Sequence, residues 1–189
     1  MVSALRLFRA LCLLVVASLV ACAPGRNLQP LPPLASTAYR LGPGDQVRVI
    51  TFGEDALSEI FRVNDAGNLA LPLLGTVQAR DLTTDELGTR LAELLKTRNL
   101  MRNPSVSVEV TEYRPAYVLG EVNKPGQFFY QPGMRVLSAI AIAGGFTYRA
   151  VDDVMAVTRV IDGRPVQGNA TPTTPIAPGD IITVYERYF

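Results

Sequence analysis

Alternating hydrophobic and polar residues predict most of the strands of this chain. In residues 105–111, three valines fall on one face and polar residues on the other, the pattern of a strand buried on one side. Residues 46–52 and 116–120 also favour strands. Further strands are expected at 61–63, at 68–71, at 127–131, near 154–161 and at 180–188. We interpret 61–63 and 68–71 as the arms of a hairpin that the turn Asn64–Gly67 closes.

Two segments have apolar residues three and four positions apart, the spacing that is typical of helices. The first helix should begin after Thr83, which forms a capping box with Glu86, and end near Thr97. The second should span 134–143, because Gly144–Gly145 supplies the positive φ that ends a helix. The apolar stripes are Leu87, Leu91, Leu94 and Leu95 in the first helix, and Val136, Leu137, Ile140 and Ala141 in the second.

Glycine and proline mark the turns between these elements. Gly42-Pro43-Gly44-Asp45 and Pro178-Gly179-Asp180 each precede a strand, and Pro125-Gly126 forms another turn. The carboxylates of Asp45 and Asp180 should accept hydrogen bonds from turn amides, so we interpret both residues as structural and not as ligands. Together the elements predict an α+β fold with two small β-rich domains, each a mixed sheet with one helix.

Composition restricts the classes of function. With 189 residues, of which 48% are hydrophobic and 19% charged, the chain should form one globular domain or two small ones. A formal net charge of +1 without basic runs argues against a nucleic-acid partner, because phosphate binding needs clustered Lys and Arg. Histidine is absent and the two cysteines lie apart, so we expect no catalytic residues, no metal site and no cofactor.

The N-terminus has the layout of a secretory signal. Arg6 and Arg9 precede the apolar run Ala10–Val20, which is shorter than the roughly 20 residues that a membrane-spanning helix needs. The run ends in Leu19-Val20-Ala21-Cys22, which resembles the lipobox of bacterial lipoproteins. This resemblance implies cleavage of residues 1–21 and lipidation of Cys22. A signal anchor with an accidental cysteine is the alternative.

Residues 22–38 are interpreted as the lipidated cysteine and a proline-rich tether. Prolines at 24, 30, 32 and 33 favour an extended chain, which could reach roughly 50 Å and hold a folded body off the bilayer. A flexible terminus without a positional role is equally consistent with this composition. Residue 23 is Ala and not Asp, which by the bacterial sorting pattern favours the outer membrane. The predicted location is therefore the outer membrane, lipid-anchored and facing the periplasm.

Motifs in both halves of the chain resemble one protein family. Residues 39–45, 64–67, 71–75 and 103–110 resemble the polysaccharide export domain, and residues 118–126, 143–145 and 178–180 resemble the soluble-ligand-binding β-grasp domain. In this order and spacing they are similar to the outer-membrane polysaccharide export lipoproteins. The resemblance implies an export domain over 39–113 and one β-grasp domain over 114–189.

The resemblance also implies a mode of action. By resemblance to this family, the protein is expected to form a ring-shaped homo-oligomer whose lumen passes a bacterial polysaccharide. The ring is expected to work with an inner-membrane polysaccharide co-polymerase. After its last strand this sequence shows no C-terminal amphipathic helix of the kind that lines the outer-membrane pore in longer members. We therefore expect a short form that sits on the membrane through its lipid, with any pore supplied by a separate outer-membrane barrel.

Four polar residues around a turn and the start of the second helix are the predicted contact with a neighbouring subunit or partner. They are Glu121, Asn123, Lys124 and Arg135. In a domain whose relatives stack around a ring, polar groups in this position are expected to face a neighbour. The alternative is that they belong only to a solvated turn.

Two other functions remain to be compared with export. In a monomeric lipoprotein that binds a sugar or another solute, Phe128, Phe129, Tyr130 and Tyr148 could stack on sugar rings, although such aromatics more often belong to a core or an interface. A glycan-cleaving enzyme would need two carboxylates about 5 to 10 Å apart. Nothing in the sequence places such a pair, so we predict that the protein is not an enzyme.

Overall fold

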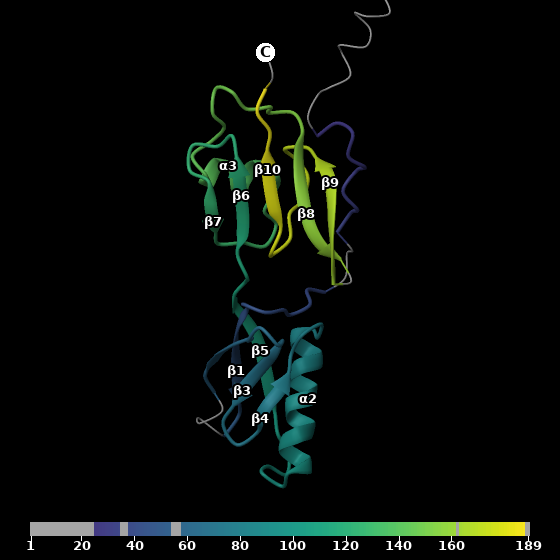
Figure 1. Cartoon of the computed structure of the whole chain (residues 1–189). Coiled ribbons are helices and arrows are strands. Elements are labelled where there is room, and N and C mark those ends of the chain that lie inside the picture. Colours follow the sequence, from purple (N-terminus) through teal and green to yellow (C-terminus); the bar gives the residue numbers. More distant parts are fainter. Residues whose placement is uncertain (1–24, 35–37, 54–57, 162, 188–189) are drawn as a thin grey trace, which may run out of the picture.

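The computed structural model describes residues 25–34, 38–53, 58–161 and 163–187. These residues form two units stacked end to end, one containing helix α2 (Thr84–Thr97) and the other helix α3 (Val136–Ile142) (Figure 1). The predicted signal peptide, residues 1–21, and the predicted lipidation site, Cys22, lie outside the described residues.

The first unit consists of a three-stranded antiparallel sheet, a separate hairpin and helix α2. The sheet contains β1 (Gln46–Thr51), β2 (Ile60–Arg62) and β5 (Val106–Glu112), and the hairpin contains β3 (Asn68–Leu71) and β4 (Gly75–Gln78). The strand order in the sheet is β2-β1-β5. Helix α2 packs on β5, and the three valines of β5 share one hydrophobic core with the leucines of the helix, as their spacing predicts.

Helix α2 begins and ends where the sequence predicts. Thr83 Oγ1 accepts a hydrogen bond from the Glu86 amide at 3.1 Å, and Glu86 Oε2 accepts one from the Thr83 amide at 2.9 Å, which confirms the capping box. Gly88 lies on the buried face of the helix, where a β-carbon would lie 3.2 Å from the Val106 carbonyl oxygen. The glycine therefore lets the helix approach β5 closely.

The prediction that residues 61–63 and 68–71 pair as a hairpin is wrong. The chain does turn at Asn64–Gly67, but β2 pairs with β1, and β3 pairs with β4. The Val63 amide donates to the Asp45 carbonyl at 2.9 Å and holds the end of β2 on β1, while the last carbonyl of the turn accepts amides from the chain just after β4. Long-range partners therefore separate two strands that a tight turn connects.

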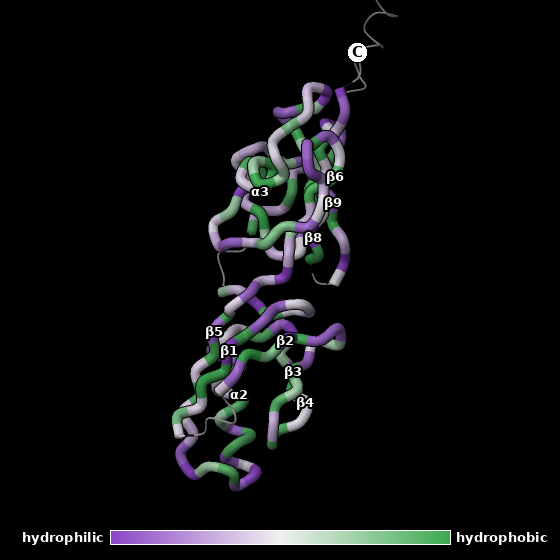
Figure 2. The backbone as a smooth tube through the Cα atoms, turned by 90° about the vertical axis from the view of Figure 1, so that its left-hand side faces the viewer, coloured by the Kyte–Doolittle hydropathy of each residue, from purple (hydrophilic) through white to green (hydrophobic). Residues whose placement is uncertain are grey.

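The second unit is a five-stranded mixed sheet with helix α3 on one face. Its strands are β6 (Ala116–Gly120), β7 (Gly126–Phe128), β8 (Met155–Ile161), β9 (Arg164–Ala170) and β10 (Ile181–Val184). In the order β7-β6-β10-β8-β9, strands β6 and β10 are parallel and the other neighbours are antiparallel. Figure 2 shows α3 on one side of the sheet. The predicted α+β fold class is confirmed.

Strands β4 and β9 are the elements that the sequence pattern missed. Strand β9 contains Pro165, Gly168 and Asn169, residues that disfavour strands, and it is held by a continuous antiparallel ladder with β8. Strands β7 and β10 are shorter than the segments predicted for them. In each case the pairing partner, and not the local composition, sets the limits of the strand.

Residues 28–32, which we call the N-terminal strap, lie along the outer edge of β9. The Leu31 amide donates to the Asn169 carbonyl at 3.0 Å, and the Asn169 amide donates to the Gln29 carbonyl at 2.8 Å. Leu31 also packs against the core of the second unit. A β-carbon at Gly168 would lie 2.5 Å from the Leu31 Cα, so this glycine makes room for the strap. This part of the predicted tether is docked on the protein and does not contribute to its reach.

Candidate functional site

The two Pro-Gly-Asp turns of the sequence meet at Arg114, at the junction of the two units. Both Asp45 and Asp180 are fully buried. Asp45 accepts a hydrogen bond from the Gly42 amide at 2.8 Å, and Asp180 accepts one from the Ala177 amide at 2.7 Å. The same amide, three residues before the aspartate, is therefore bound in both turns.

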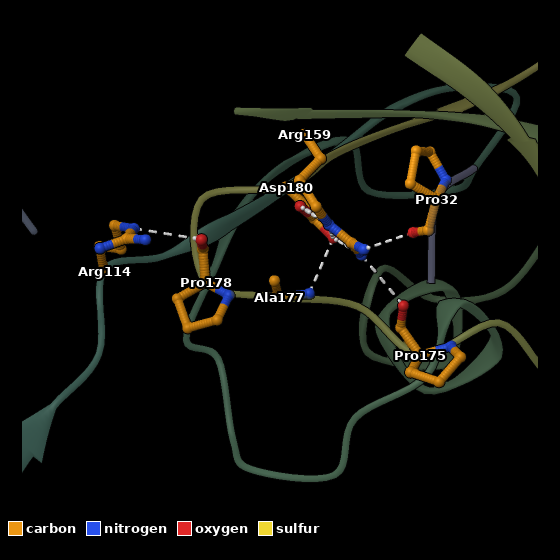
Figure 3. Close-up of polar contacts among 7 residues, drawn as sticks. All are labelled: Pro32, Arg114, Arg159, Pro175, Ala177, Pro178 and Asp180. Atoms are coloured by element: carbon orange, nitrogen blue, oxygen red, sulfur yellow. Dashed lines mark hydrogen bonds and ion pairs between the residues drawn. The ribbon is translucent and has the colours of Figure 1, made fainter. Parts of the chain in front are cut away.

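Asp180 is paired with Arg159 of β8 in a buried fork (Figure 3). Arg159 Nε lies 3.0 Å from Asp180 Oδ1, and Nη2 lies 2.7 Å from Oδ2. Nη2 also donates to the carbonyl oxygen of Pro175, at 3.1 Å, and Nη1 donates to that of Pro32 in the strap, at 3.3 Å. Only 8% of the Arg159 side chain is exposed. One ion pair thus joins the sheet, the turn before β10 and the N-terminal strap.

Asp45 is paired with Arg114, which lies in the link between the units. Asp45 Oδ1 accepts the Arg114 amide at 2.7 Å, and Oδ2 accepts the Tyr39 hydroxyl at 2.6 Å and Arg114 Nη1 at 3.3 Å. Arg114 Nε donates to the Pro178 carbonyl at 3.1 Å (Figure 3). The arginine therefore connects both turns. Burial and the hydrogen bond to Asp45 raise the pKa of the Tyr39 hydroxyl far above its ordinary value.

Three tyrosines form an aromatic path across the junction. The ring centroids of Tyr39 and Tyr113 are 5.0 Å apart, and those of Tyr113 and Tyr130 are 5.5 Å apart, both in edge-to-face geometry. Tyr130 belongs to the second unit, and burial raises the pKa of its hydroxyl. The Gly179 amide donates to the Pro115 carbonyl at 3.0 Å beside this path. The two units therefore share a packed polar and aromatic joint.

The chemistry of this joint is structural. Both carboxylates are buried, and each is bound by an arginine and by turn amides. Within the described parts of the chain there is no group of three His, Cys, Asp or Glu side chains that could hold a metal ion. The arrangement fixes the relative position of the two units and the path of the strap.

A cleft of about 710 Å³ opens beside the joint. The first unit contributes Arg40 and Arg80 to its wall, the link contributes Arg114, and the second unit contributes Val160 and Gly163. Arg40 is paired with Glu86 at 3.0 Å, and Arg80 Nη2 donates to the Asp65 carbonyl at 2.8 Å. The wall also contains the carboxylate of Asp81, so the cleft is lined by both signs of charge, and its guanidinium groups have N–H donors beyond those already bound.

The four residues predicted to contact a neighbour lie where turns of the second unit meet. Asn123 Nδ2 donates to the Gly144 carbonyl at 2.8 Å, Arg135 Nη1 donates to the Thr173 carbonyl at 2.5 Å, and Glu121 Oε2 accepts the Thr147 hydroxyl at 2.5 Å. The Lys124 side chain passes close to Gly144. All except Glu121 are exposed. Three of the four thus have bonds within the chain, and their contact with a second molecule stays a prediction.

The predicted turns at 42–45, 144–145 and 178–180 are present, whereas Gly126 of the predicted Pro125-Gly126 turn is the first residue of β7. Positive φ angles occur at Gly44, Gly144, Gly145 and Gly179. The Gly144 and Gly145 amides donate back to carbonyls of α3 and end the helix.

The four aromatics considered for sugar stacking are not gathered into one platform. Phe128 packs against the core of the second unit, and Tyr130 packs against Tyr113 in the joint. Phe129 is 71% exposed and Tyr148 is 88% exposed. Only the last two therefore present an open ring face to solvent.

Sequence reasoning missed both arginines that pair with the buried aspartates, Arg114 and Arg159, as well as the tyrosines of the joint. Arg159 had a visible signal, because it is a charged residue within the apolar run of β8. Arg114 had none, since it lies in a short polar link that reads as a surface segment. Asp180 is 21 residues away from Arg159 in the chain, and Asp45 is 69 residues away from Arg114.

Comparisons with known proteins match both units. The family model described as polysaccharide biosynthesis/export protein matches residues 33–111, and the SLBB domain model matches residues 115–170. The exopolysaccharide production protein ExoF of Rhizobium meliloti (strain 1021) is 36% identical over 118 residues, which cover 57% of this chain and 28% of that protein. The matched region is therefore less than a third of the relative. In the described parts of the chain, no helix has the length and apolarity needed to cross a membrane.

Proposed function

This chain belongs to the polysaccharide export protein family, and we propose that it acts in the export of a capsule or an exopolysaccharide as a periplasmic component held at the outer membrane by a lipid on Cys22. The observation that carries the proposal is the order of the two matched domains along one chain, an export domain followed by an SLBB domain. The packed joint between them supports a role in which the two domains act as one body.

The proposal includes assembly into a ring or adaptor that passes the polysaccharide towards the outer membrane. Exposed apolar side chains support this assembly: Ile50, Phe52 and Ile60 in the first unit, and Tyr117, Leu119 and Val160 on the open face of the second sheet. Apolar side chains that lie together in one patch on a surface commonly mark contacts with other protein molecules. Each unit also has a small core of its own, so that contacts between subunits would add stability.

The proposed partners follow from the same family. They are further copies of this chain, an inner-membrane polysaccharide co-polymerase, and a separate outer-membrane barrel if a pore is needed, with a bacterial polysaccharide as the cargo. No catalytic step is assigned to the chain. Cys22 connects the protein to the membrane through acyl chains.

Deletion of the gene tests the export role. We expect loss of secreted polysaccharide, restored by the wild-type chain and restored poorly by Cys22→Ser, because that variant cannot be held at the membrane. Light scattering of the lipidated protein in detergent should show an oligomer. Normal secretion in the deletion strain together with a strictly monomeric protein would contradict the proposal.

Charge reversal tests the predicted contact surface. Lys124→Glu removes an exposed cation without breaking the bonds made by Asn123 and Arg135, so it should weaken oligomerisation and leave Tm nearly unchanged. The matched control is Lys96→Glu, an exposed lysine of α2 in the first unit. Equal oligomerisation of both variants and the wild type would show that this surface is only a solvated turn.

The cleft at the joint favours a second candidate, a monomeric protein that binds an acidic sugar. Arg80 in its wall, with Arg40 and Arg114 beside it, would recognise a carboxylate group, although Asp81 lies in the same wall. Titration of the monomer with glucuronate oligosaccharides separates the candidates. Saturable binding that Arg80→Ala abolishes would favour solute binding, and absence of binding would leave export as the better explanation.

A further inference from the structure

The first described residues of the chain are fixed at the end of the second unit that points away from the first unit (Figure 1). Gly25 packs against the ring of Tyr185. Arg26 Nη2 lies 2.7 Å from Asp153 Oδ2, and the strap then runs along β9. The path of the chain towards its N-terminus is thus defined up to Gly25.

This position limits where a lipid on Cys22 can lie. Cys22 precedes Gly25 by three residues, which reach at most about 10 Å when fully extended. The acyl chains must therefore enter the bilayer within a short distance of Tyr185. A free tether of residues 22–38 would have allowed the protein to stand well away from the membrane, but the docked strap removes most of that length.

We propose that this end of the second unit, which we call the terminal surface, rests on the headgroups of a phospholipid bilayer. The terminal surface consists of Tyr148, Arg149, Tyr185 and Arg187. Its parts are tied together, since the Val151 amide donates to the Tyr185 carbonyl at 2.9 Å and the Arg187 amide donates to the Arg149 carbonyl at 2.7 Å. This inference rests on the lipidation of Cys22 in the proposed function.

Tyr148 is the side chain best suited to the headgroup region. It is 88% exposed, at a site where an aromatic ring is not needed for the core of the second unit. Tyrosine is enriched at membrane–water interfaces because its ring is apolar and its hydroxyl binds water and headgroups. The exposure of Tyr148 therefore fits contact with a bilayer surface.

Two of the three arginines at this end of the protein are paired with a carboxylate, and the third, Arg187, is bound to a neutral carbonyl. Arg149 is paired with Glu186, Arg26 with Asp153, and Arg187 Nη2 donates to the Ala150 carbonyl at 3.1 Å. A surface of this kind does not gain much from anionic lipid. The contact should therefore depend on the acyl chains at Cys22 and change little with the fraction of anionic lipid in the membrane.

A single fluorescent label tests the contact. Removal of residues 1–21 removes Cys12 and lipid blocks Cys22, so Tyr148→Cys carries the only free thiol of the mature protein. The lipidated variant is labelled with an environment-sensitive dye and placed in vesicles of phosphatidylethanolamine and phosphatidylglycerol. Quenching by lipids with a headgroup-region nitroxide should be at least about threefold stronger than for Glu93→Cys, an exposed control on α2.

A longer connection to the lipid gives the second arm of the test. An insertion of about ten Gly and Ser residues between Pro24 and Gly25 adds a mean reach of about 17 Å and should lower quenching at position 148 towards that of the control. Quenching at position 148 no stronger than at position 93 would overturn the proposal. If quenching at position 148 is strong and the insertion does not lower it, the short connection between Cys22 and Gly25 is not what holds the terminal surface at the bilayer.

Mass spectrometry of the N-terminal peptide separates this inference from the proposed function. An acylated Cys22 with an unquenched label at position 148 would overturn the terminal surface alone. An unacylated Cys22 would overturn both the lipid anchor and the contact built on it. Tyr148→Cys should melt at the wild-type temperature, because the side chain is exposed.

Discussion

The two Pro-Gly-Asp turns are alike in their own bonds and unlike in their surroundings. Each buries an aspartate that accepts the amide three residues before it, and each pairs that aspartate with an arginine. Arg159 beside Asp180 is 8% exposed and binds as a fork, whereas Arg114 beside Asp45 is 30% exposed and lies at the joint. A repeated local sequence thus builds the same turn twice, while the partner arginine decides whether the turn stabilises one unit or connects two.

The largest expected effect is that of Asp180→Asn. It leaves a buried guanidinium without its charge partner, so the free energy of unfolding of the mature protein should fall by about 3–5 kcal/mol, measured by urea denaturation. Asp180→Leu combined with Arg159→Met should cost less than Asp180→Asn, because no buried charge is left unpaired. A change within about 0.5 kcal/mol for Asp180→Asn would show that the pair is not important for stability.

Asp45→Asn makes the matched change in the other turn. Arg114 is partly exposed and water can solvate it again, so we expect a loss of only about 1–3 kcal/mol in the same measurement. The contrast between the two turns fails if this variant is destabilised as strongly as Asp180→Asn.

Tyr39, which donates to Asp45, should make the stability of the first turn depend on pH above pH 10. Its folded pKa is raised above the ordinary value of 10.0, so its contribution to stability is fully present below pH 10 and is lost as the pH rises further. Above pH 10 the free energy of unfolding should fall by about 1.4 kcal/mol per pH unit from this residue. Tyr39→Phe should remove this part of the slope, and Tyr117→Phe, on the exposed face of the second sheet, should not. If the free energy of unfolding falls equally steeply with pH in Tyr39→Phe and in the wild type, the fall is not due to Tyr39.

The smallest expected effect concerns the strap on the Asp180 side. Asn169 Nδ2 donates to the Leu28 carbonyl at 2.7 Å, and Asn169→Ala should cost about 1 kcal/mol while it loosens the strap. Trypsin should then cut faster after Arg26. Gln167→Ala, an exposed position of the same strand, is the control. Unchanged cleavage in Asn169→Ala would mean that the backbone bonds alone hold the strap.

Sequence reasoning succeeded where a pattern is local. The capping box of Thr83 and Glu86, the end of α2 at Thr97 and the bounds of β6 depend on residues a few positions apart. The carboxylates of the two turns were assigned to turn amides for the same reason, since the donor lies three residues away.

Long-range pairing defeated the same reasoning. The tight turn at Asn64–Gly67 suggests a hairpin, but the strand before the turn, β2, pairs with β1, and the strand after it, β3, pairs with β4. Strand β9 and the strap exist because each has a neighbour to pair with, although neither has a strong strand sequence. Arg114 finds Asp45 across 69 residues, a distance over which one sequence carries no pattern.

The strap also protects the edge strand β9 from pairing with a strand of another copy of this protein. An uncovered β9 would offer free amides and carbonyls to any other strand, which is a common route to aggregation. The strap covers that edge, and its own Pro30 and Pro32 lack the N–H groups that another strand would need. A recombinant protein trimmed to residues 39–189 would lose this cover. Any oligomers of that trimmed protein in solution would then reflect pairing through the uncovered edge of β9 and not the natural assembly.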